Sequence, residues 1–377
     1  MIPASVYEET LLSFLAPVRP FLDDPSVTEI MINGPSHIYV ERGGMIEETN
    51  ACFASERALL AAVRNIAQYV GRRADEEQPV LEARLPDGSR VQAVLPPLVR
   101  CPHLSIRRFP KGVLTMERLV ELGSLTSDAA ELLDAMVAGK QNIVVAGGTG
   151  SGKTSMLNVM SSFIANHERI VVIEDARELN LQKPHVVQME VRPKDVRGRG
   201  EISVRDLFRA TLRMRPDRVV IGEIRGPEAL DLIQAMTSGH GGCLTTVHAT
   251  YPADTLHRLE TMALMSDVRL PLEALRAQIA SAVNIVVQTA RGPEGRRWVT
   301  HISEVRGYAP STGYVLSDLF ARHQTTDGGS LLKPTTLLPK CYTKVLALSA
   351  QGRSFPQLAA RVRGSRIEQS GSHAESE

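Results

Sequence analysis

Residues 147–154 read GGTGSGKT and match the pattern G-x-x-x-x-G-K-[ST]. Glycines let backbone N–H groups turn inward around a phosphate, and the start of a following helix adds a partial positive charge. We expect Lys153 to reach the β- and γ-phosphates of ATP and the Thr154 hydroxyl to bind Mg²⁺. The predicted nucleotide-binding residues of this phosphate loop are Gly147, Gly148, Thr149, Gly150, Ser151, Gly152, Lys153, Thr154 and Ser155.

Acidic residues follow two other apolar runs of the sequence. Residues 218–223 end at Glu223, and residues 169–174 end at Glu174, with Asp175 and Glu178 close behind. A phosphate loop needs a carboxylate at the end of a neighbouring strand, to hold Mg²⁺ or to activate water. Glu223 is the best candidate for the general base that reaches the attacking water. The alternative is that these acids cap the helices that follow, where the helix dipole favours them.

A histidine-bearing segment lies downstream. Residues 237–242 form a glycine-rich turn, and residues 243–249 read as a strand that carries His248 near its carboxyl end. Ligands bind at the carboxyl ends of strands in open α/β folds, so this imidazole could sense the γ-phosphate. The alternative is a structural histidine with satisfied hydrogen bonds.

The elements around these residues indicate an α/β fold. Apolar runs without polar alternation are separated by helical patterns, which is typical of a parallel sheet covered on both faces. Because a strand precedes the glycine-rich turn and a helix follows it, a turn without a ligand is the weaker interpretation. The expected strands are residues 141–148, 169–174, 218–223, 243–249 and 296–307, and the expected helices are 154–166, 204–214 and 227–236.

The first third of the chain has a different pattern. Residues 26–40 hold two short apolar runs split by a turn, residues 55–70 have apolar residues at helical spacing, and Asp87-Gly88 separates two further runs as in a hairpin. These features predict a small α+β domain. The expected organisation is an N-terminal domain over 1–109, a linker over 110–127, a nucleotide-binding domain with a C-terminal subdomain over 128–363, and a disordered tail over 364–377.

Composition excludes several classes of protein. The formal net charge is +1, so no global field draws the chain to nucleic acid or to an anionic membrane. Four cysteines without a C-x-x-C pair argue against a zinc site or a disulfide framework and favour a reducing, intracellular compartment. The sequence predicts neither a signal peptide nor an apolar run that could span a bilayer, so work at a membrane would need a partner. Residues 191–218 are rich in arginine but hold only one aromatic residue, Phe208, so they lack the stacking platform that single-stranded nucleic acid would need.

Four motifs together resemble one family, the type II/IV secretion ATPases. GGTGSGKT resembles the Walker A loop of that family, VIEDARELNL its Asp box, RPDRVVIGEIRGPEALDLIQAM its Walker B motif and TSGHGGCLTTVHA its His box, in the same order. Upstream, VTEIMINGPSHIYVERGG, RLPDGSRVQAVLPP and LSIRRF resemble the N-terminal domain of the tight-adherence (Flp-type) pilus branch. The similarity runs from about Phe21 to about Leu346, and the longer N-terminal extension common in the branch is not part of this sequence.

The resemblance implies a RecA-like motor domain with a parallel sheet, a smaller PAS-like α+β N-terminal domain, and a homo-hexamer powered by ATP and Mg²⁺. It implies a cytoplasmic protein attached peripherally to the inner membrane through a platform protein of a pilus or secretion machine. The rival interpretations are a RecA-like nucleic-acid translocase and a nucleotide-binding ring component without turnover. By motif, the resemblance assigns catalysis to Lys153, Glu223, Glu174, Glu178 and His248, metal binding to Thr154, Glu174 and Asp175, and further nucleotide contacts to His240, Arg90, Arg107 and Arg108.

Overall fold

The structure is a computed structural model that describes residues 4–108, 114–192, 194, 198–292, 295–325, 329–335, 337–350, 355, 357–358 and 360. The chain divides into two compact units, one of residues 1–113 with 292–296 and one of residues 114–291 with 297–377. The domain limits predicted from the sequence remain predictions, and the tail over 364–377 lies outside the described residues.

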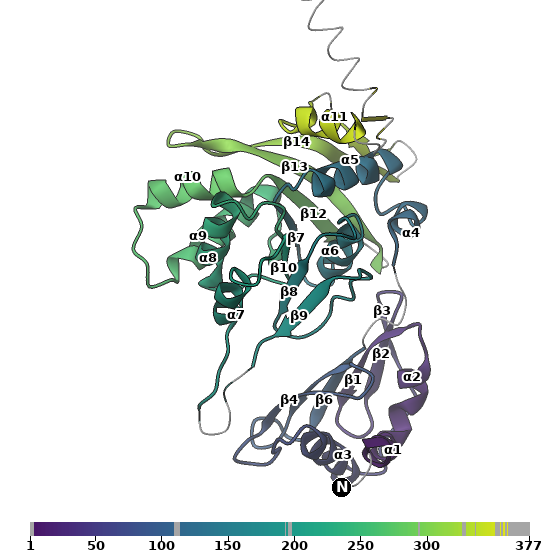
Figure 1. The fold of residues 1–377 in the computed structure, drawn as a ribbon. Coiled ribbons are helices and arrows are strands. Elements are labelled where there is room, and N and C mark those ends of the chain that lie inside the picture. Colours follow the sequence, from purple (N-terminus) through teal and green to yellow (C-terminus); the bar gives the residue numbers. More distant parts are fainter. Residues whose placement is uncertain are drawn as a thin grey trace, which may run out of the picture. The chain divides into compact units, whose positions relative to one another are not determined.

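The N-terminal unit is a six-stranded sheet in the order β3-β2-β1-β6-β5-β4, in which all neighbouring strands are antiparallel (Figure 1). The buried side chains of the sheet form one hydrophobic core with those of the helices that pack on it. The elements are α1 (Ala4–Phe14), a 3-10 turn (Ala16–Val18), α2 (Arg19–Asp23), β1 (Val27–Asn33), β2 (Ile38–Arg42), β3 (Met45–Glu48), α3 (Glu56–Tyr69), β4 (Val80–Arg84), β5 (Arg90–Val94) and β6 (His103–Arg107).

Two local predictions for this unit are confirmed. The Ser55 hydroxyl accepts a hydrogen bond from the backbone N–H of Ala58 and caps α3, whose apolar face is buried. Asp87 accepts hydrogen bonds from the backbone and the hydroxyl of Ser89, and Gly88 has a φ of 88°, which a glycine adopts without strain. The turn joins β4 and β5 as the predicted hairpin.

The C-terminal unit holds a nine-stranded sheet in the order β15-β14-β13-β12-β7-β11-β10-β8-β9. The strands from β12 to β9 in this order are parallel, and β13 to β15 add an antiparallel edge. Its strands are β7 (Ile143–Gly147), β8 (Ile170–Glu174), β9 (Val186–Glu190), β10 (Arg218–Ile221), β11 (Leu244–His248), β12 (Ile285–Arg291), β13 (Arg297–Ala309), β14 (Gly313–Gln324) and β15 (Ser330–Pro334). Its helices are α4 (Met116–Glu121), α5 (Ser127–Ala138), α6 (Lys153–Ser161), α7 (Val204–Thr211), α8 (Glu228–Thr237), α9 (Pro252–Leu264), α10 (Leu272–Ala282) and α11 (Tyr342–Ala350).

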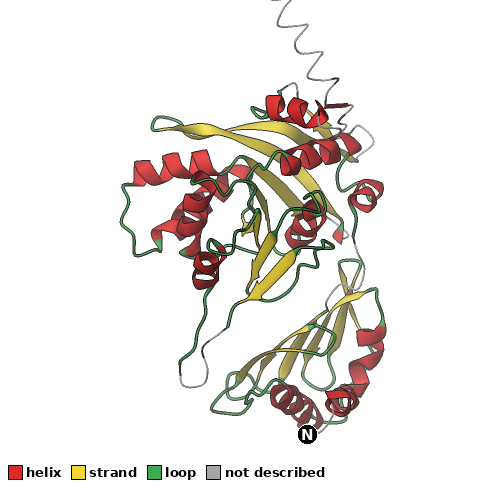
Figure 2. Ribbon diagram, viewed as in Figure 1, coloured by secondary structure: helices red, strands yellow, loops and turns green. Residues whose placement is uncertain are grey.

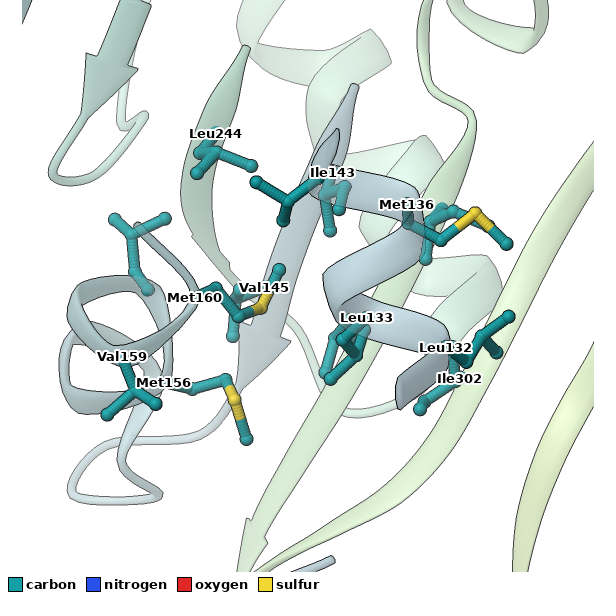
Figure 3. Close-up of a cluster of buried hydrophobic side chains, with 14 of the residues drawn as sticks. Leu132, Leu133, Met136, Ile143, Val145, Met156, Val159, Met160, Leu244 and Ile302 are labelled. Atoms are coloured by element: carbon teal, nitrogen blue, oxygen red, sulfur yellow. The ribbon is translucent and has the colours of Figure 1, made fainter. Parts of the chain in front are cut away.

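Helices cover both faces of this sheet, as the sequence predicted (Figures 1 and 2). Ile143 and Val145 of β7 belong to one buried cluster with side chains of α5 and α6. Val144 and Ala146, which point to the other face, belong to a second cluster with α8, α9 and α10. Figure 3 shows part of the first cluster, including Leu132, Leu133, Met136, Met156, Val159 and Met160.

A buried ion pair ties together the amino ends of the central strands. Arg218, the first residue of β10, has a fully buried side chain, and its Nε lies 2.7 Å from Glu168 Oε2. A second guanidinium nitrogen of Arg218 donates to Val137 O at 2.7 Å, and Lys140 Nζ lies 3.1 Å from Glu168 Oε2. Burial raises the pKa of Glu168, but the hydrogen bonds and charges of Arg218 and Lys140 outweigh it and lower this pKa from 4.5 to about 2. This carboxylate therefore stays ionised in the folded chain.

Among the described residues, no helix combines the length and the apolar character that crossing a membrane requires.

Candidate active site

The phosphate loop leaves the carboxyl end of β7 and enters α6. Gly150 and Gly152 have φ angles of 68° and 92°, which favour glycine and turn the loop back on itself. A Cβ added to Gly147 would lie 2.4 Å from both Ser151 Oγ and Thr289 Oγ1, so no larger residue fits there. Ser151 Oγ also lies 2.9 Å from Thr289 Oγ1, on the neighbouring strand β12. The loop is therefore held from inside by a residue far away in the sequence.

Lys153 is buried at the start of α6, and its ammonium contacts the phosphate loop. Its Nζ donates to Gly148 O at 2.8 Å and lies 3.4 Å from each ring nitrogen of His248. Because β11 runs parallel to β7, with His248 beside Gly147, the imidazole stands at the same edge of the sheet as the loop.

Glu223 completes this group. It follows β10, the neighbour of β11, and its Oε1 lies 2.8 Å from His248 Nε2. Lys153 and Glu223 therefore approach the same imidazole, as a phosphate site with an opposing carboxylate requires. Burial lowers the pKa of His248 below its ordinary 6.5, and the charge of Lys153 adds to this effect against that of Glu223. The ring is therefore neutral at pH 7.

Arg225 is a member of the site that the sequence reasoning missed. Its Nε donates to Glu223 Oε2 at 2.6 Å, and a terminal nitrogen lies 3.4 Å from Asp175 Oδ2. Burial lowers the pKa of Arg225, but the carboxylates of Glu223, Asp175 and Glu178 raise it above its usual value. The available signal was the position of this arginine two residues after the predicted general base.

The other acidic residues predicted for the site lie at its edge. Glu174 ends β8 in a buried position, and its Oε1 accepts the backbone N–H groups of Glu178 and Leu179, both at 2.9 Å. This oxygen organises the turn after β8, but the next element is β9 and not a helix, so Glu174 does not cap a helix as the alternative supposed. The Thr154 hydroxyl donates to Glu178 Oε2 at 3.3 Å, so Glu178 lies beside the predicted metal-binding hydroxyl.

The oxygen atoms of Thr154 and Glu178 are suited to bind a Mg²⁺ ion that the nucleotide phosphates also bind. Among the described residues, no group of three or more His, Cys, Asp or Glu gathers as a metal site. Mg²⁺ in phosphate-transfer sites is bound through one or two carboxylates together with phosphate oxygens and water. The hydroxyl of Thr154 beside the carboxylate of Glu178 supplies hard oxygen donors of this kind next to the loop.

His240 is not brought to the phosphate loop of its own chain. It precedes β11, whose first residue, Leu244, pairs with the first residue of β7, whereas the loop follows the last. His240 therefore lies toward the amino ends of the strands, away from His248. Within the described part of the chain its Nδ1 is buried without a hydrogen-bond partner. The predicted nucleotide contact of His240 stays a prediction from the motif.

The three predicted N-terminal arginines lie on the sheet of the other unit. Arg90 of β5 and Arg107 of β6 are direct cross-strand neighbours, and Arg84 of β4 pairs with Arg90 on the far side, so three arginines stand in one row. Arg108 is buried and donates to the backbone carbonyl oxygens of Asp24 and, at 3.2 Å, Val27.

A glycine-rich loop after a strand of a parallel sheet, a buried lysine that contacts this loop and a carboxylate at the end of a nearby strand define a P-loop nucleoside triphosphatase. The chain matches the model of the Type II/IV secretion system protein family over residues 13–306, and it belongs to that family. The predicted family is thereby confirmed, while the tight-adherence branch remains a prediction.

Named relatives agree with this assignment. The chain is 35% identical over 305 residues to a putative conjugal transfer protein of Mycobacterium tuberculosis. The alignment covers 79% of this chain and 86% of that protein. It is 34% identical over 337 residues to the type IV secretion system protein VirB11 of Brucella suis, covering 80% and 91% of the two chains. The ATPase DotB of Yersinia pseudotuberculosis superposes with a TM-score of 0.56 over 82% of each chain at 17% identity. This likeness concerns the fold, and the predicted RecA-like α/β class is confirmed.

We expect the change Arg225→Gln to lower kcat for ATP hydrolysis about tenfold, with little change in KM. A charge-assisted hydrogen bond contributes about 1.5–3 kcal/mol when buried, and the partial exposure of Arg225 reduces this. Steady-state kinetics with Arg225→Lys, which keeps the charge, should recover part of the rate. Arg213→Gln, which removes an exposed arginine after α7, is the matched control. An unchanged kcat in Arg225→Gln would show that Glu223 does not depend on this arginine.

Proposed function

We propose that this chain hydrolyses ATP at the phosphate loop between β7 and α6. The observation that carries the proposal is the convergence of Lys153 and Glu223 on His248, which places an ammonium for phosphate and a carboxylate for water at one edge of the sheet. A ring component that only binds nucleotide would be expected to lack one of these groups, and this chain has both.

The proposed mechanism assigns each group one task. The loop amides and Lys153 hold the β- and γ-phosphates, and Glu223 aligns the attacking water and accepts its proton. Arg225 fixes the orientation of the Glu223 carboxylate. His248, neutral at pH 7, occupies the space between acid and lysine and is proposed to contact the γ-phosphate. Thr154 and Glu178 would hold Mg²⁺, which neutralises charge on the phosphate oxygens when bound.

The remaining predicted ligands are proposed from sequence. Arg90, Arg107 and Arg108 are proposed to complete the phosphate site, because a guanidinium fork matches the spread charge of a phosphate. Supplied by a separate unit, such an arginine would couple the position of that unit to the nucleotide state. A structure with a non-hydrolysable ATP analogue would show which of the three contacts the γ-phosphate, and would also test Glu174, Asp175 and His240.

The proposed biological role is that of a motor for pilus assembly or protein secretion. Membership of the Type II/IV secretion system protein family supports it, and the upstream motifs favour the tight-adherence pilus branch. We propose that six copies form a ring on the cytoplasmic face of the inner membrane and pass their motion to a platform protein. Hydrolysis would release the γ-phosphate contacts and let the two units reorient.

The test measures phosphate release by the purified chain across a range of protein concentrations, alongside its mass in solution. We expect the specific activity to rise as the chain assembles, and a fully active monomer would contradict the ring. Single- and double-stranded DNA at moderate salt provide a second arm of the test. Strong stimulation by either would favour a nucleic-acid translocase over a secretion motor.

A further inference from the structure

Two arginines of the β12–β13 hairpin lie against Gly150 and Gly152 of the phosphate loop. Arg291 ends β12 and Arg297 begins β13, and the two residues are cross-strand partners. Arg297 Nε donates to Gly150 O at 2.8 Å. A Cβ placed on Gly150 would lie 3.1 Å from Arg291 Nη1, and one placed on Gly152 would lie 3.4 Å from Arg297 Cδ.

Gly150 and Gly152 are therefore required for two reasons. Their φ angles are positive, and a side chain at either position would meet an arginine. The aliphatic stem of Arg297 covers Gly152 and its guanidinium holds the carbonyl of Gly150, while Arg291 crosses Gly150. The peptide of the Gly150 carbonyl also carries the N–H of Ser151, which donates to Gly148 O at 3.4 Å, so Arg297 holds a peptide that is also hydrogen-bonded within the loop. Arg297 and Thr289 therefore hold the loop at two separate points, Gly150 O and Ser151 Oγ.

We propose that Arg291 and Arg297 form a cationic clamp on the phosphate loop that strengthens binding of the polyphosphate chain of a nucleotide. Both side chains are exposed guanidinium groups, so they add two positive charges next to Lys153 and the amino end of α6. Their attraction acts on the phosphates and grows with the number of phosphate charges. This inference rests on the proposed function, because it concerns the same nucleotide.

The experiment measures the dissociation constants of ATP, ADP and AMP for the full chain by calorimetry. EDTA is present to remove Mg²⁺, so that ATP is not hydrolysed during the measurement. We expect Arg291→Gln and Arg297→Gln each to weaken ATP binding about three- to tenfold, and the double variant to weaken it further. The loss should be smaller for ADP and smallest for AMP, and it should shrink as salt screens the charges. Arg297→Lys keeps the charge and should recover most of the ATP affinity.

Lys333→Gln is the matched control, because it also removes one exposed positive charge. Lys333 lies on β15, an edge strand that β14, β13 and β12 separate from β7 and its phosphate loop. It should leave all three dissociation constants unchanged. Equal ATP affinity in the double variant and the wild type would overturn the clamp, as would a loss of the same factor for all three nucleotides. If the wild type binds none of them, the proposed function and the clamp both fall. If Arg297→Gln does not fold, as judged by its thermal melt, Arg291→Gln decides alone.

Discussion

The change Glu223→Gln is expected to slow ATP hydrolysis by about three orders of magnitude and to leave ATP affinity within about threefold. A positioned general base contributes roughly 10²–10⁴ to the rate, and glutamine has the shape of the carboxylate but cannot accept the proton of the attacking water. Affinity should survive because Lys153 and the loop glycines hold the phosphates without Glu223. Single-turnover phosphate release together with equilibrium binding of ATP separates the two effects.

Glu190→Gln is the matched control for this change. Glu190 ends β9, so it is also a glutamate at the carboxyl end of a parallel strand, but β9 lies at the edge of the sheet rather than beside β11. We expect its turnover to equal that of the wild type. Hydrolysis at the wild-type rate in Glu223→Gln would remove Glu223 from the mechanism and make Glu178, next to Thr154, the acid to test next.

Those parts of the site that depend on one strand and the turn after it could be predicted from the sequence. The loop at residues 147–154, the acid at Glu223 and the histidine at His248 each follow an apolar run, and parallel strands bring their carboxyl ends to one edge. The sequence analysis placed both His248 and His240 at the nucleotide site, whereas in the structure the two residues lie at opposite ends of β11. The motif joined them, but the direction of the strand keeps them apart.

The contacts that hold these groups could not be predicted. Thr289, Arg291 and Arg297 reach the loop from more than a hundred residues away, and nothing in their local sequence indicates which strand lies beside β7. Strands β14 and β15 were missed because their polar, half-exposed residues lack the apolar pattern of a buried strand. Arg225 was adjacent to a predicted residue, yet its pairing with Asp175 depends on how two strand ends approach.

The largest effect on stability is expected from Glu168→Gln. Removing one partner of a buried ion pair costs about 3–5 kcal/mol, because the guanidinium of Arg218 would remain buried without its counter-charge. Urea denaturation of the full chain, followed by a signal from the C-terminal unit, measures the change. Glu121→Gln is the matched control, because Glu121 pairs with Arg118 at the surface and such exposed pairs contribute about 0–1 kcal/mol.

The pH dependence of the free energy of unfolding of Glu168→Gln is a second, independent test of the ion pair. The pKa of Glu168 is lowered from 4.5 to about 2, so the folded chain releases this proton more readily than the unfolded chain. Its contribution to the free energy of unfolding is therefore present above about pH 4.5 and is lost as the pH falls toward 2, by about 3 kcal/mol in total. Glu168→Gln should lack this part of the acid transition, while Glu121→Gln should keep it. If the two variants lose stability in parallel with the wild type between pH 4.5 and 2, the amino ends of the central strands are not held by the ionised pair.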